Sequence, residues 1–208
     1  MPRQVDHDER RLEILQVARH LIAERGPAGV SFREIGRRMG GSTTLVTHYY
    51  AQQGDLFKDL ASTSVDAWEA DLDELQQKHP DPVELFNVVL FEWLVPIEGE
   101  DLLNERYRIN FVAAGLQGES TQDVLDAWEE GVKVVFRRVL KGLVKRSEVE
   151  HYADVLRAAF NGIALSTVEH PDHWTVNRQR KVLAALVEGL GLPVDASRGR
   201  TRAVRATG

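Results

Sequence analysis

Apolar residues recur along most of the chain at the three- and four-residue spacing of amphipathic helices. The first such stretch begins near Asp6 and ends at Gly26-Pro27, a pair that stops helices, and a long one runs from Gln53 to about Lys78. Further helices are expected at about 101–116, 121–145, 148–169 and 174–190. This pattern predicts an all-α protein of about nine helices.

The segment between Pro82 and Pro96 is apolar nearly all round. Its β-branched and aromatic residues also suit a buried strand, but its length and its flanking prolines favour a buried central helix. Asp81 can cap that helix, with Pro82 at the first helical position.

Two short helices are predicted between the first helix and the long one. Ser31 and Glu34 have the spacing of a capping box, which starts a helix with its apolar residues on one face. Gly40-Gly41 breaks this helix, and Ser42 can cap a second. Two short helices joined by a tight glycine turn predict a helix-turn-helix, which lays its second helix in the major groove of DNA.

Composition limits the class of protein. The chain has 208 residues, 43% of them hydrophobic, so it can bury a core of one or two domains. It has no cysteine, which excludes disulfides, thiol catalysis and thiolate metal sites and suits a reducing cytoplasm. No apolar run has the length of a membrane span, and residues 1–11 are charged. We therefore expect a soluble cytoplasmic protein.

The net charge of −6 is unevenly distributed. Residues 1–57 hold 8 Lys and Arg against 7 Asp and Glu, whereas residues 58–194 hold 14 against 24. The acidity therefore lies away from the predicted helix-turn-helix and does not argue against DNA. A local charge of +1 gives only weak electrostatic attraction to DNA. Tight binding would therefore need two recognition helices per site, and phosphate contacts from backbone and hydroxyl groups.

The motif also resembles a known family. The first helix ends in glycine and is followed by S-F-R-E-I-G-R-R-M-G-G-S-T-T-L-V-T-H-Y-Y-A-Q-Q-G-D-L-F, which is similar to the signature of TetR-family transcriptional repressors. The T-H-Y-Y run looks most like the branch that includes the choline-responsive betaine regulator. The resemblance covers residues 10–60, and beyond them it lies in helix number, order and length.

The resemblance implies an all-helical homodimer. Residues 1–52 would form the helix-turn-helix DNA-binding domain and residues 53–194 the domain for ligand binding and dimerisation, while the basic tail, 195–208, is expected to be disordered. The resemblance implies base-edge contacts from Thr43, Thr44 and Thr47, and phosphate contacts from Ser31, Arg33, Ser42, His48 and Tyr49.

Three further residues, Leu45, Val46 and Tyr50, should pack the recognition helix onto its domain. Two positions depart from the family pattern. Gly41 stands where valine is usual, which predicts a looser turn. Gln53 stands where a phosphate-binding lysine is usual, so a charge is lost there.

A ligand-binding region is predicted in the later helices. Glu92, Asn110 and Asn161 are polar residues among apolar neighbours, and a ligand is one partner that buried polar groups can have. The alternative is that they bond to neighbouring side chains or lie exposed. The aromatic residues that could line the pocket, or simply form the core, are Trp68, Phe86, Trp93, Tyr107, Phe111 and Trp128. Aromatic rings with a carboxylate slightly favour an organic cation over a neutral hydrophobic effector.

The last two predicted helices carry the runs A-A-F-N-G-I-A-L and V-L-A-A-L-V-E-G-L. Small residues among leucines allow the close helix approach of a four-helix dimer interface, although they also suit packing within one chain.

The sequence as a whole predicts a transcriptional repressor that binds a palindromic operator as a homodimer and is released by a small molecule, with no catalytic residue, metal or cofactor. One alternative is an enzyme that uses Glu92 or the cluster His170-Pro171-Asp172-His173, whose histidines could also bind metal. That cluster also makes an ordinary helix break and cap. Another alternative is a constitutive architectural DNA binder with a fully packed core.

Overall fold

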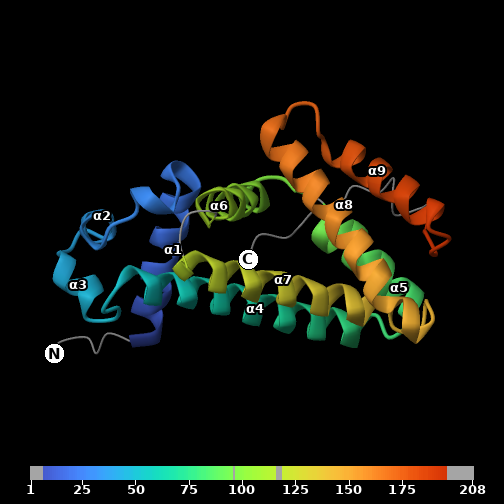
Figure 1. Ribbon diagram of the computed structural model, residues 1–208, viewed down its shortest axis with the longest axis horizontal. Coiled ribbons are helices and arrows are strands. Elements are labelled where there is room, and N and C mark those ends of the chain that lie inside the picture. Colours follow the sequence, from blue (N-terminus) through green and yellow to red (C-terminus); the bar gives the residue numbers. More distant parts are fainter. Residues whose placement is uncertain (1–6, 96, 116–118, 196–208) are drawn as a thin grey trace. The chain divides into compact units, whose positions relative to one another are not determined.

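The computed structural model describes residues 7–95, 97–115 and 119–195, and within them it is all helical (Figure 1). Nine α-helices and no β-strand occur in this described part, as the hydrophobic pattern predicted. The α-helices are α1 (His7–Arg25), α2 (Phe32–Arg38), α3 (Thr43–Thr47), α4 (Gln53–Lys78), α5 (Pro82–Val88), α6 (Glu100–Gly115), α7 (Glu119–Leu140), α8 (Val149–Glu169) and α9 (Val176–Gly189). Two 3-10 turns, Pro27–Gly29 and Arg146–Glu148, and a π-helix, Val89–Leu94, complete them.

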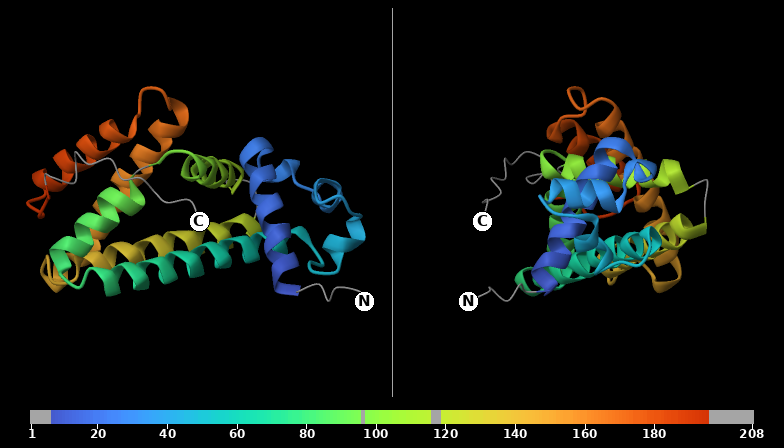
Figure 2. Two further views of the ribbon diagram at one scale, coloured as in Figure 1. Left: turned by 180° about the vertical axis from the view of Figure 1, so that it is seen from behind. Right: turned by 90° about the vertical axis from the view of Figure 1, so that its left-hand side faces the viewer.

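The chain divides into two compact units. Unit 1 comprises residues 1–66 and 103–129, and unit 2 comprises residues 67–102 and 130–208. Unit 1 thus combines α1, α2 and α3 with the first part of α4, most of α6 and the first part of α7. Unit 2 contains α5, the π-helix, α8 and α9, with α8 next to α9 in both views (Figures 1 and 2).

Unit 1 has its own core, built from the apolar faces of α1, α2, α3 and α4. Ile14, Ile22, Ile35 and Val46 are fully buried there. A carboxylate ties these elements together, because Asp59 on α4 accepts hydrogen bonds from Arg11 on α1 and from the Tyr50 hydroxyl. Burial and the bond to Asp59 raise the pKa of Tyr50, so its hydroxyl stays a donor at neutral pH.

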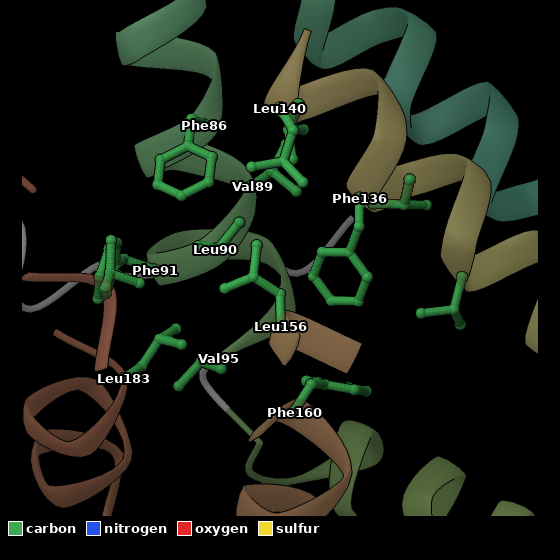
Figure 3. Packing of buried hydrophobic residues seen from close by; sticks show 14 of the residues in the cluster. Phe86, Val89, Leu90, Phe91, Val95, Phe136, Leu140, Leu156, Phe160 and Leu183 are labelled. Atoms are coloured by element: carbon green, nitrogen blue, oxygen red, sulfur yellow. The ribbon is translucent and has the colours of Figure 1, made fainter. Parts of the chain in front are cut away.

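The core of unit 2 contains a larger apolar cluster (Figure 3). Most of its residues come from α5, the π-helix, α7, α8 and α9, and Leu72 comes from α4. The side chains at its centre are Phe86, Val89, Leu90, Phe91, Val95, Phe136, Leu140, Leu156, Phe160 and Leu183.

The predicted central helix between Pro82 and Pro96 begins as expected and then changes form. Asp81 caps it, accepting a hydrogen bond from Glu84 N at 2.8 Å, but α-helical geometry ends at Val88. The Phe91 carbonyl in the π-helix accepts a 2.9 Å hydrogen bond from Arg180 Nε, which is buried. This long-range bond satisfies a backbone group inside the core, which local periodicity could not reveal. Pro96 lies outside the described residues.

One other helix boundary and one cap differ from the predictions. The prediction that α7 continues to about Lys145 is wrong, because the helix ends at Leu140 and Gly142 takes the left-handed conformation at φ +87°. The spacing of Ser147 and Glu150 predicts a capping box at the start of α8, and this prediction is also wrong. Ser147 lies in a 3-10 turn and makes no cap, while Glu150 pairs with Arg137.

In the described ranges, no helix combines the length and the apolar character that crossing a membrane requires.

Candidate nucleic-acid interface

The turn between α2 and α3 has the geometry of a helix-turn-helix. Ser31 caps α2, accepting a 3.2 Å hydrogen bond from Glu34 N, as the capping box predicted. Gly40 ends the helix in the left-handed conformation at φ +70°. A Cβ at Gly36 would lie 2.6 Å from Ser42 O, so only glycine allows the two helices to approach this closely.

The short helix α3 separates its apolar and polar residues onto two faces. Val46 is fully buried and Tyr50, just beyond the helix, is nearly so, which confirms that these residues pack α3 onto unit 1. The opposite face is solvent-exposed and carries Thr43, Thr44, Thr47 and His48. Ser42 occupies the N-cap position, but its hydroxyl forms no capping bond. The threonine face is therefore presented outward from a rigid support.

Gly41 and Gln53, the two departures from the family pattern, have defined environments. A Cβ at Gly41 would lie 3.2 Å from Leu45 Cδ1, a tight contact that glycine avoids. The Gln53 amide donates to Val30 O at 2.8 Å and to Pro27 O at 3.2 Å. Because its amide bonds backbone carbonyls, Gln53 holds the start of α4 against the 3-10 turn rather than offering these donors to a phosphate.

Most of the positive charge near α2 is neutralised within the protein. The Glu34 carboxylate accepts two hydrogen bonds from Arg37, at 2.8 and 2.9 Å, and lies 3.5 Å from Arg25. These arginines lower the pKa of Glu34 to about 2, chiefly through the Arg37 hydrogen bonds. Arg38 pairs with Glu24. By contrast, Arg33 is exposed and forms no ion pair with any residue in the described part of the chain.

We expect Glu34→Gln to strengthen non-specific DNA binding, because it removes a negative charge and frees Arg37, whose side chain is 67% exposed. Affinity for random-sequence duplex should rise about fivefold at low salt. The slope of log affinity against log salt concentration should steepen by about one, because about one more counterion is released. Fluorescence anisotropy across a salt series measures both. Glu74→Gln is the matched control, since Glu74 pairs with Lys78 in unit 2. An unchanged salt dependence in Glu34→Gln would show that Arg37 lies away from the DNA.

A ring cluster joins the start of α1 to the end of α3. His48 and Tyr49 contact each other edge-to-face, with ring centroids 5.4 Å apart, and the His7 ring lies 5.9 Å from both. The Tyr49 hydroxyl is 3.2 Å from His7 Nδ1. His48 and Tyr49 are thus held next to each other and to the threonine face, at a position where both can donate hydrogen bonds to a phosphate.

The Asp59 carboxylate should matter for the stability of unit 1. Replacing it by Asn removes the charged acceptor for Arg11 and Tyr50, so we expect Asp59→Asn to lower the free energy of unfolding by about 1–2 kcal/mol. Chemical denaturation measures this change. Asp66→Asn, at an exposed position of the same helix, should change stability by less than about 0.5 kcal/mol. Equal stabilities of the two variants would contradict the role given to Asp59.

Comparison with known proteins agrees with this geometry. Residues 14–60 match the model of bacterial regulatory proteins of the tetR family, and residues 90–192 match that of the BetI-type transcriptional repressor C-terminal domain. The chain belongs to the TetR family. It is therefore a transcriptional regulator and not an enzyme, which decides against the alternative based on Glu92 or the His170–His173 cluster.

Relatives and solved structures cover most of the chain. The HTH-type transcriptional regulator PksA of Bacillus subtilis is 25% identical over 196 residues, which are 91% of this chain and 94% of PksA. A Rhodococcus transcriptional regulator superposes with a TM-score of 0.75 at 21% identity, covering 88% of this chain and 97% of its own. A regulator from Saccharomonospora viridis, solved in complex with choline, superposes with a TM-score of 0.71 at 20% identity, with coverages of 88% and 97%.

The predicted ligand residues fall into two groups, one in each unit of this TetR-family fold. In unit 1, Tyr107, Phe111 and Trp128 are buried in one ring cluster, with centroids 5.2 to 5.9 Å apart. Asn110, on α6, bonds to the backbone of α1. Its side-chain amide donates hydrogen bonds to the carbonyls of Ile22 and Ala23, both at 3.1 Å. These bonds join the last turns of α1 to α6.

The remaining candidates belong to unit 2. Phe86 is fully buried in the core, and Trp68 and Trp93 pack against it half-buried. Trp93 Nε1 donates to Asp71 at 3.3 Å, and Asn161 accepts a hydrogen bond from Arg157. Glu92 is half-buried within the π-helix. Of the polar candidates, Asn110 and Asn161 thus follow the alternative expectation that they bond within the protein.

The histidines of the predicted cluster at 170–173 lie at an exposed turn between α8 and α9, with ring centroids 6.4 Å apart. No group of three or more potential metal ligands occurs among the described residues.

Proposed function

We propose that this TetR-family regulator represses transcription by binding a palindromic operator as a homodimer, and that a small molecule bound in its C-terminal part releases it. Residues 1–52 would be the DNA-binding domain and residues 53–194 the ligand-binding and dimerisation domain, acting in the cytoplasm. The observation that carries the proposal is the exposed threonine face of α3, supported on the buried Val46.

The proposed contacts follow from this face and from the charges around it. Thr43, Thr44 and Thr47 would contact base edges, which hydroxyls of this size can reach in the major groove. Ser31, Arg33, Ser42, His48 and Tyr49 would bind phosphates. Because Arg37 and Arg38 are paired with carboxylates, the described residues around α2 offer few unpaired cations to a phosphate, which favours two recognition helices on one operator.

Affinity selection from random-sequence duplexes with the full-length protein tests this function. We expect an inverted repeat whose half-site centres lie about one helical turn apart, because two-fold protein symmetry is matched by two-fold DNA symmetry. If no sequence is enriched, specific DNA recognition is refuted. If a single unrepeated site is enriched, binding by two paired recognition helices is refuted.

The effector is proposed to be an organic cation rather than a neutral hydrophobic compound. Its support is the half-buried residue Glu92, whose neighbours in the sequence are Phe91 and Trp93, together with the choline held by the Saccharomonospora viridis regulator. Aromatic rings and a carboxylate both stabilise a positive charge that leaves water. The ligand would act through its different affinity for the operator-bound and free geometries of the dimer.

Release of the selected operator, followed by anisotropy, separates the two ligand classes. Choline and its uncharged isostere 3,3-dimethyl-1-butanol differ in charge but hardly in shape, so we expect choline to release the DNA at lower concentration. Glu92→Gln should weaken that effect about tenfold, while Glu69→Gln, at an exposed position of α4, should not. If both compounds release the DNA equally well, the proposal of a cationic effector is refuted, whereas the proposal of a ligand-released repressor is not.

A further inference from the structure

His7, at the start of α1, lies against the end of the recognition helix α3. Its Nδ1 atom is 3.2 Å from the Tyr49 hydroxyl, and its ring centroid is 5.9 Å from those of both Tyr49 and His48. His7 and His48 are exposed and Tyr49 is half-buried, so DNA can reach all three. The proposed phosphate contacts of His48 and Tyr49 therefore have a titratable neighbour on a different helix.

The direction of the hydrogen bond between His7 and Tyr49 depends on where His7 carries its proton. An Nδ1 atom without a proton accepts from the Tyr49 hydroxyl, whose one hydrogen is then used within the protein. In the imidazolium form, Nδ1 carries a proton and donates to the hydroxyl oxygen instead. The hydroxyl hydrogen can then be donated to a DNA phosphate, and the imidazolium adds a positive charge beside it.

The arginines one helical turn from His7 are engaged with carboxylates. Arg10 pairs with Glu13 on the same helix. Arg11 donates to Asp59 on α4 at 2.7 Å. These two cations are balanced within the protein, so an imidazolium at His7 would supply a charge to a phosphate that they do not.

Two further titratable groups lie next to His7. Asp8 follows it in the chain, and His48 faces it from the end of α3. Histidine is the side chain that changes its charge between pH 5 and 8. Two neighbouring imidazolium rings repel each other, whereas a phosphate beside them supplies the opposite charge and favours the protonated rings. The complex with DNA then binds more protons than the free protein does, so affinity rises as the pH falls.

We infer that His7 is a positioning residue for DNA binding: its protonated Nδ1 holds the Tyr49 hydroxyl as a donor toward a phosphate, and binding takes up a proton at this ring. The inference rests on the proposed phosphate contacts of Tyr49 and His48. It adds to them a residue from another helix and a dependence of DNA affinity on pH.

Fluorescence anisotropy of the full-length protein with a random-sequence duplex tests the inference, from pH 8 to pH 6 at constant ionic strength. We expect wild-type affinity to rise about 25-fold over this range, from about fivefold for each of His7 and His48. His7→Ala should retain a rise of only about fivefold, which His48 supplies. His20→Ala is the matched control. His20 lies on the same helix about 20 Å further along, beyond the screening length at moderate salt, and its Nδ1 is 2.8 Å from Gln16 O, so the variant should keep the wild-type profile.

The variant Tyr49→Phe separates positioning from a direct phosphate contact of His7. At pH 6 we expect His7→Ala to weaken binding about fivefold when Tyr49 is present and by less than about twofold in the Tyr49→Phe background, because the hydroxyl that His7 orients is then missing. Equal effects in the two backgrounds, or a His7→Ala profile identical to that of wild type, overturn the inference.

The same measurements distinguish this inference from the proposed function. If wild type binds no duplex at any pH, DNA binding itself fails and the role of His7 fails with it. If Tyr49→Phe weakens binding at pH 6 while His7→Ala keeps the wild-type profile, the phosphate contact of Tyr49 stands and only the role of His7 is refuted.

Discussion

Replacing Thr44 and Thr47 together by alanine should abolish most operator preference while leaving the fold intact. Both residues are exposed on α3, and the helix is held by Val46 on its other face. Loss of each base contact should cost on the order of 1–3 kcal/mol of specific binding free energy, or about tenfold or more in affinity. Gel shifts on the selected operator and on a scrambled duplex measure the preference.

The threonine pair also allows a control for folding. Thr47 Oγ1 donates to Thr44 O at 3.3 Å, a weak local bond whose loss should hardly change the melting temperature. Thr175→Ala removes an exposed threonine from the start of α9, where it forms no capping bond, and should bind the operator like wild type. If the double variant prefers the operator over the scrambled duplex as strongly as wild type does, α3 is not the recognition helix.

The second large effect is expected at the proposed dimer interface of unit 2. Leu165 on α8 and Val182 on α9 are 44% and 41% exposed, and they lie next to exposed small residues such as Gly162 and Ala185. If these faces meet in the dimer, the double variant Leu165→Glu/Val182→Glu would bury unpaired charges. We expect monomers and a loss of about 100-fold or more in operator affinity, because two half-sites are no longer bound together.

The choice of positions follows from the structure. Ala159 and Leu186 belong to the same small-residue runs, but both are half-buried and Leu186 packs against the unit 2 core, so a charge there would also disturb the fold. Val83→Glu on α5 is the matched control, since this valine is also 41% exposed. Analytical ultracentrifugation reports the outcome. A wild-type protein that is monomeric at micromolar concentration, or a double variant that stays dimeric, contradicts the interface.

Local signals in the sequence were sufficient for the helix-turn-helix. The Ser31–Glu34 spacing predicts a capping bond that the structure contains, and the bounds predicted for α4 hold at both ends. These features depend on residues a few positions apart, so periodicity and capping rules capture them.

Features that depend on distant residues were not predictable in this way. In the π-helix, the carbonyl of Phe91 accepts a hydrogen bond from Arg180, which lies 89 positions away in the sequence. The sequence also did not separate the ligand candidates of unit 1 from those of unit 2, because Asn110 and Glu92 both stand between apolar residues in the sequence although they belong to different units. The pairing of Arg38 with Glu24, 14 positions away, is likewise not visible in the residues around either of them. Sequence spacing shows which residues share a face, but not what lies opposite.

Comparing the full inverted repeat with a single half-site tests whether two recognition helices bind one operator together. Native mass spectrometry gives the number of protomers on each duplex, and anisotropy gives the affinity. We predict two protomers on the full repeat and an affinity for the half-site that is lower by about 100-fold or more. One protomer on each duplex with equal affinity would contradict a regulator that reads DNA with paired recognition helices.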